Sequence, residues 1–334
     1  MKLSLILVVL LVAVPAFAQP QSARNQQPVV TDDEVKVTVY KQFWDNRVPN
    51  PTVAYQAARD YMQRYSKEDD QYTRYLKVWM AAYEEDERTA RMAAERADRE
   101  QQLLGSFTVK NYAKAYSLAT PVLTDNPNNL RVLIALGYGA VAASAERNEA
   151  FNAEAGIHAA KAIQLIESGK TPVGEGGGAV WAPFKSKEDV LGSLHYALGF
   201  YALKPTPDSA VPHFIKAAQV DADRRNSPTT YSLLALAYQN GPYKRLSEDF
   251  TKRFGNQPES PESKAALDGV NKVVDKMIDA YARAVALAGT NPQNQAAKAQ
   301  WTTQLTNFYK FRNNNSDAGL NELIAGVLAK PLPQ

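Results

Sequence analysis

The chain has 334 residues, a formal net charge of +3 and no cysteine. The absence of cysteine excludes disulfides, thiolate metal sites and a cysteine-linked lipid anchor. A net charge this close to zero argues against nucleic acid or an anionic membrane surface as the partner.

Residues 1–18 are typical of a secretory signal peptide. Lys2 supplies the positive end, residues 3–14 form an apolar run, and residues 16–18 (Ala-Phe-Ala) form a small-x-small cleavage site. A transmembrane anchor is the alternative, but it needs about 20 apolar residues and this run is shorter. We therefore expect a periplasmic or extracellular protein that has no transmembrane segment after cleavage and is not lipid-anchored.

Residues 19–50 begin with a polar, proline-bearing stretch, and we assign the whole segment to a flexible leader. Within it, residues 35–40 alternate apolar and polar side chains. Because no pairing strand is visible, this short segment either starts the first helix or stays extended. Pro49 and Pro51 then precede a predicted helix from Thr52.

Residues 70–104 contain neither glycine nor proline and predict one long helix. Its first half is aromatic, whereas residues 84–102 carry charges of both signs. Two interpretations of the charged half remain: a solvated helix, or a coiled-coil contact with another chain.

Three later stretches repeat one pattern, in which a large residue is followed by Leu three positions on, a small residue, and an aromatic residue or Ala. The copies are Leu133, Leu136, Gly137 and Ala140; His195, Leu198, Gly199 and Ala202; and Tyr231, Leu234, Ala235 and Tyr238. These spacings place the residues on one face of a helix, and the small residue lets a neighbouring helix approach closely. A fourth copy at 301–308 is imperfect, because Gln304 replaces the Leu.

Partner halves such as Ala210, Phe214 and Ala217 accompany these stretches. Together they resemble the tetratricopeptide repeat, a helix-turn-helix unit of about 34 residues. The resemblance implies an all-α fold over residues 51–330, a right-handed solenoid of about five antiparallel helix pairs with long inter-helix insertions. An irregular bundle of amphipathic helices is the alternative.

The resemblance also implies a non-enzymatic scaffold that binds a peptide or protein in a concave groove. In the family, the first helix of each pair lines that groove. The corresponding residues here are Ile134, Tyr138, Val141, Tyr196, Phe200, Leu203, Leu236, Gln239 and Tyr309.

An insertion at residues 168–188 interrupts the repeats with a glycine run at 174–178, followed by Trp181 and Phe184. Large apolar residues on a loop often mark a contact site, but they can also fold back as a lid over a helix pair. An alternative function follows from these aromatics, namely binding of an envelope glycan or a small molecule.

Patterns for catalysis are incomplete. Residues 168–171 end like a phosphate-binding loop, but Gln164 stands where that loop needs glycine, and no strand precedes it. His158, His195 and His213 are far apart in the sequence and form no metal-type pair. We therefore expect no catalytic residue, no metal and no cofactor. A hydrolase on a helical scaffold is a further alternative, without a visible nucleophile and base.

The signal peptide makes a direct prediction: the mature protein begins at Gln19, after cleavage at Ala18. Intact-mass measurement of the exported protein tests this, and retention of Met1 in the exported fraction would contradict it.

Overall fold

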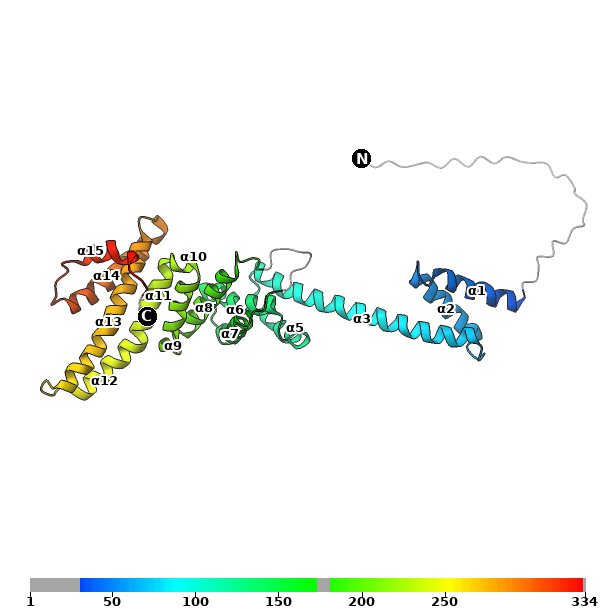
Figure 1. Ribbon diagram of the computed structural model, residues 1–334, viewed down its shortest axis with the longest axis horizontal. Helices are drawn as coiled ribbons and strands as arrows, with labels where there is room; N and C mark the ends of the chain where they lie inside the picture. Colours follow the sequence, from blue (N-terminus) through cyan, green and yellow to red (C-terminus); the bar gives the residue numbers. More distant parts are fainter. Residues whose placement is uncertain (1–30, 173–180, 333–334) are drawn as a thin grey trace, which may run out of the picture. The chain divides into compact units, whose positions relative to one another are not determined.

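The computed structural model describes residues 31–172 and 181–332 (Figure 1). These residues form helices and no strand, which confirms the all-α prediction for the described part of the chain. The predicted signal peptide and the glycine run at 174–178 lie outside the described residues. Contacts divide the chain into an N-terminal unit, up to Met92, and a C-terminal unit, from Ala93.

The N-terminal unit contains α1 (Asp32–Asn46), α2 (Pro51–Tyr65) and the first part of α3 (Gln71–Thr108). Helix α1 corrects the prediction of a flexible leader through residue 50. It forms because Thr31 and Glu34 make a reciprocal capping box, and because it buries Phe43 completely. The alternation of apolar and polar residues at 35–40 by itself leaves open whether this segment is helical or extended.

Aromatic side chains dominate the core of the N-terminal unit. Phe43 meets Trp79 edge to face at 5.0 Å between ring centroids, and Tyr61 lies 5.0 Å from Tyr65. Such pairs stabilise a small core beyond the area they bury. Three short helix segments therefore form a compact unit.

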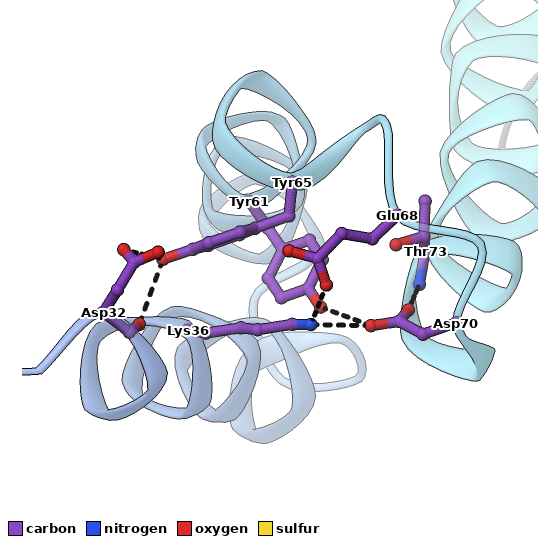
Figure 2. A network of polar contacts seen from close by, with 7 residues as sticks. All are labelled: Asp32, Lys36, Tyr61, Tyr65, Glu68, Asp70 and Thr73. Carbon is purple, nitrogen blue, oxygen red and sulfur yellow. Dashed lines mark hydrogen bonds and ion pairs between the residues drawn. The ribbon is translucent and has the colours of Figure 1, made fainter.

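A polar network joins the start of α1 to the start of α3 (Figure 2). Lys36 Nζ pairs with Glu68 and lies 2.8 Å from Asp70 Oδ2, while Asp70 Oδ1 accepts the Thr73 backbone N–H at 2.7 Å. Hydrogen bonds to Asp70 and Glu68 raise the pKa of Lys36. Burial alone would raise the pKa of Asp70, but the hydrogen bonds from Lys36 and Thr73 lower it. Lys36 and Asp70 therefore form an ion pair at neutral pH.

The C-terminal unit contains the end of α3 and all later helices (Figure 1). These are α4 (Tyr112–Ser117), α5 (Ala119–Asp125), α6 (Leu130–Ala145), α7 (Asn152–Glu167), α8 (Lys187–Ala202), α9 (Pro207–Val220), α10 (Ala222–Arg225), α11 (Pro228–Tyr238), the π-helix η2 (Gln239–Tyr243), α12 (Lys244–Phe254), α13 (Pro261–Ala288), η3 (Pro292–Asn294), α14 (Gln295–Arg312), α15 (Leu320–Gly326) and η4 (Val327–Ala329). Each of α6 to α9 packs against its chain neighbours, α9 packs on α11, α11 on α13, and α13 on α14.

The helix bounds mostly follow the sequence pattern. Helix α13 spans Pro261–Ala288, with Ser260 as its cap, and α15 begins at Leu320 because Gly319 before it takes a left-handed φ of +87°. On α3, residues 84–98 are exposed all round, although Glu84 accepts a hydrogen bond from the Tyr55 hydroxyl and Arg96 pairs with Asp125.

Helices α6 and α7 approach closely at Gly137. A Cβ atom added there would lie 2.7 Å from the Cα atom of Ala159 on α7. The neighbouring Leu136 is fully buried, as the repeated pattern predicts, and so is Leu234 in α11. The small residue therefore sets the distance between the two helices, and the large one fills the seam beside it.

We expect Gly137→Ala to lower the free energy of unfolding by about 1–3 kcal/mol, because the added methyl group meets backbone that cannot move aside cheaply. Gly269 in α13 is the matched control, since a Cβ there meets no atom within 4 Å. Gly269→Ala should instead raise the stability by up to about 1 kcal/mol through helix propensity. Urea unfolding of the full chain measures both, and equal effects would contradict the close approach.

A histidine pair joins α8 to α9. His195 Nδ1 lies 3.1 Å from His213 Nδ1, and His195 Nε2 is buried without a hydrogen-bond partner in the described residues. Burial, together with His213 and Lys216, lowers the pKa of His195 to about 4, and burial lowers the pKa of His213. The fold therefore holds the pair neutral at pH 7.

The lowered pKa predicts acid sensitivity of this helix pair. Between pH 6.5 and 4 the unfolded chain binds a proton at His195 that the folded chain does not. The contribution of neutral His195 to the free energy of unfolding is fully present above pH 6.5 and is lost as the pH falls towards 4. His195→Asn should remove about 1.4 kcal/mol per pH unit from this dependence. Hydrogen exchange of the α8 amides measures the slope, and an unchanged slope would contradict the assignment.

Candidate functional site

A pocket of about 420 Å³ opens in the C-terminal unit beside α6, and we call it the α6 pocket. The end of α3, the outer face of α6 and the segment before α8 form its walls. Its lining residues are Leu104, Phe107, Thr108, Tyr112, Arg131, Ile134, Ala135, Tyr138, Gly139, Ala142, Pro172, Trp181, Ala182, Pro183 and Phe184.

Helix α6 supplies one wall through Ile134 and Tyr138, which are one turn apart on the same face. The ring of Phe107, at the end of α3, lies directly on Gly139, where an added Cβ would come within 2.1 Å of the ring. Glycine at this position therefore lets the end of α3 lie against α6 and form the second wall.

The segment from Trp181 to Phe184 folds back and forms the third wall. The Phe184 backbone N–H donates to the Trp181 carbonyl at 2.8 Å, and the Phe184 ring meets Tyr138 edge to face at 5.7 Å. Ser186 caps α8 directly after this segment. Both aromatic side chains are half-buried, so they pack as a lid and also line an accessible pocket.

Arg224 in α10 supports one wall of the α6 pocket without lining the pocket itself. It donates to the Tyr138 hydroxyl at 2.9 Å and to Ser193 Oγ at 3.0 Å, and its guanidinium lies 4.4 Å from the Tyr196 ring centroid. Asp221 accepts the Arg224 backbone N–H and fixes this short helix. Arg224 therefore fixes the position of Tyr138.

Arg224 is not among the residues that the sequence predicts, because it is 86 residues from Tyr138 and lies in a four-residue helix. No local pattern marks this position. The contact arises only when α6, α8 and α10 come together.

The chemistry of the α6 pocket is apolar and aromatic. Among its described lining residues, Arg131 is the one charged side chain, and no carboxylate or imidazole is present. The lining therefore offers mainly apolar and aromatic contacts, with the Arg131 guanidinium and the hydroxyls of Thr108, Tyr112 and Tyr138 as its polar groups.

The remaining groove residues do not join this pocket. Tyr196, assigned to the groove, is only 8% exposed because Arg224 covers its face and Phe214 lies 5.8 Å away. Phe200 and Leu203 line a separate cavity of about 500 Å³ between α7, α8 and α9. Ile134 and Leu203 are likewise largely buried.

The last groove candidates are bound within the fold. Gln239 accepts the Tyr281 hydroxyl at 3.2 Å, and the Tyr309 hydroxyl donates to the Ala318 carbonyl at 2.8 Å. Leu236 and Val141 are half-buried against the core. The predicted residues thus fall into separate environments, and Ile134, Tyr138, Trp181 and Phe184 are the set that the structure brings together.

The described residues contain no group of three or more metal-ligating side chains. No helix in residues 31–172 or 181–332 combines the length and apolar character that crossing a membrane requires.

Comparison of the chain with protein-family models, with curated proteins and with solved structures finds no significant match. Functional inference therefore rests on the residues and their geometry.

Proposed function

We propose that the C-terminal unit is a binding scaffold that takes up a short peptide segment of a partner protein in the α6 pocket. One observation carries the proposal: Ile134 and Tyr138, assigned to a groove, line the same cavity as Trp181 and Phe184, assigned to a contact loop. Residues predicted for the groove and residues predicted for the loop contact therefore line one pocket.

The dimensions and chemistry of the pocket favour a peptide as the ligand. A volume of about 420 Å³ is in the range of pockets that bind small ligands, and it accommodates a few amino-acid side chains. Aromatic walls bind apolar side chains by desolvation and stacking. Arg131 at the edge offers hydrogen-bond donors to a peptide carbonyl or carboxylate. We therefore expect an aliphatic or aromatic anchor residue with an acidic neighbour.

The scaffold we propose is a tetratricopeptide-like solenoid within a protein exported through the signal peptide. The serial packing of α6, α7, α8, α9, α11, α13 and α14 supports this arrangement. The close contact between α6 and α7 at Gly137 also supports this arrangement, since tetratricopeptide-like repeats pack large residues beside small ones. Each helix then presents a face to its neighbours while α6 keeps part of its outer face accessible.

The proposal predicts that peptides selected on the full chain depend on the α6 pocket. Selection from a displayed random peptide library, followed by titration of synthetic peptides, is the measurement. Trp181→Ala and Tyr138→Ala should each weaken binding about tenfold, or 1.4 kcal/mol, because each removes one aromatic wall.

Val109→Ala is the matched control, because Val109 is an exposed apolar residue next to the pocket-lining Thr108. It should leave the affinity unchanged. Circular dichroism of all variants checks that the fold is retained. Selected peptides that bind wild type and both aromatic variants equally would overturn the proposal.

A further inference from the structure

A second cavity, of about 910 Å³, opens in the N-terminal unit, and we call it the aromatic pocket. Helix α1 forms one side, the start of α3 forms the other, and Tyr61 of α2 contributes between them. Its lining residues are Asp33, Lys36, Val37, Tyr40, Lys41, Trp44, Asp45, Tyr61, Gln71, Tyr72 and Tyr75. The proposed peptide site does not involve any of these residues.

Large aromatic rings remain exposed in this pocket. Trp44 is 43% exposed, Tyr72 40% and Tyr75 41%. Tyr40 joins them, with its ring centroid 4.5 Å from that of Tyr72 and the planes inclined at 60°. The Arg47 guanidinium lies 3.4 Å from the Trp44 ring centroid and covers one face of the indole. The pocket therefore presents several ring faces at different inclinations.

The polar groups of these aromatic residues have unused hydrogen-bonding capacity. Within the described residues, the hydroxyls of Tyr40, Tyr72 and Tyr75 and the indole N–H of Trp44 have no hydrogen-bond partner in the protein. These groups are available to a ligand, unlike the Tyr61 hydroxyl, which donates to Asp70 Oδ2 at 3.4 Å.

The charged groups of the pocket largely neutralise one another. Asp33, Lys36, Lys41 and Asp45 line it, two of each sign. Lys36 pairs with Asp70 in the network of Figure 2, and Lys41 Nζ lies 2.5 Å from Asp45 Oδ2. A ligand of high charge would therefore find no unpaired countercharge of either sign beyond the carboxylate of Asp33.

We propose that the aromatic pocket binds a neutral oligosaccharide. A pyranose ring has an apolar face of C–H groups, which stacks on an aromatic face, and a rim of hydroxyls that both donate and accept hydrogen bonds. Trp44, Tyr72 and Tyr75 supply the faces. The tyrosine hydroxyls, the Gln71 amide and the Asp33 carboxylate supply donors and acceptors of the matching kind. The size and open form of the pocket fit more than one sugar unit.

A proline-rich peptide is the main competing ligand, because such peptides also dock on aromatic grooves. Its backbone offers carbonyl acceptors but few donors, so it leaves the Asp33 carboxylate and the acceptor lone pairs of the tyrosines unsatisfied. A saccharide satisfies both kinds of group, and for this reason we favour it.

Isothermal titration of the full chain with neutral hexasaccharides of glucose, xylose, mannose and N-acetylglucosamine tests the proposal. We expect at least one to bind, with an affinity that changes little between 0.05 and 0.5 M salt, because the ligand has no charge to screen. Trp44→Ala should weaken this binding about tenfold through the lost stacking surface.

Tyr72→Phe removes one hydroxyl and keeps the ring, so it should weaken binding severalfold without disturbing the fold. Phe311→Ala, at an exposed aromatic residue of the C-terminal unit, is the matched control and should leave the affinity unchanged. Failure of every hexasaccharide to bind would overturn the proposal. So would binding that Trp44→Ala and Tyr72→Phe leave intact, or Trp44-dependent binding of a decaproline peptide in place of the saccharides.

Discussion

The C-terminal unit depends on the close approach of neighbouring elements to α6. Gly137 and Gly139 are two positions apart and therefore face opposite sides of this helix. On one side Gly137 meets the backbone of Ala159 in α7, and on the other Gly139 supports the ring of Phe107. Helix α6 thus packs against α7 in the core and also forms a wall of the α6 pocket. A change in its packing would therefore also change the binding surface.

Tyrosine serves two different purposes in this chain. In the C-terminal unit, the hydroxyls of Tyr116 and Tyr201 donate to carbonyls of α6, at 2.6 and 3.0 Å, and their rings fill the core. Burial raises the pKa of both hydroxyls, so they remain neutral donors. In the N-terminal unit, the hydroxyls of Tyr40, Tyr72 and Tyr75 line the aromatic pocket and have no such partner among the described residues. In this pocket the same side chain is available for recognition.

Arg224 shows how one cation organises a binding surface without lining it. Its guanidinium fixes the hydroxyl of Tyr138 and covers the ring of Tyr196. The first contact orients a wall of the α6 pocket. The second contact removes a large aromatic residue from the surface.

The sequence by itself determined the helical class and the apolar helix faces on which Leu136 and Leu234 are buried. These properties depend on periodicity and caps within one segment, and such signals are local. It also identified Tyr138 and Trp181 as candidates, but not that they line the same cavity.

Only the tertiary structure decided which helix faces are covered. Tyr196 and Leu203 occupy positions that a repeat leaves open, but Arg224 and neighbouring helices cover them. The aromatic pocket could not be predicted for the same reason, since residues of α1 and α3 meet only after folding. Periodicity shows that a face is apolar; which neighbour covers it depends on contacts between residues distant in the sequence, and no local pattern records them.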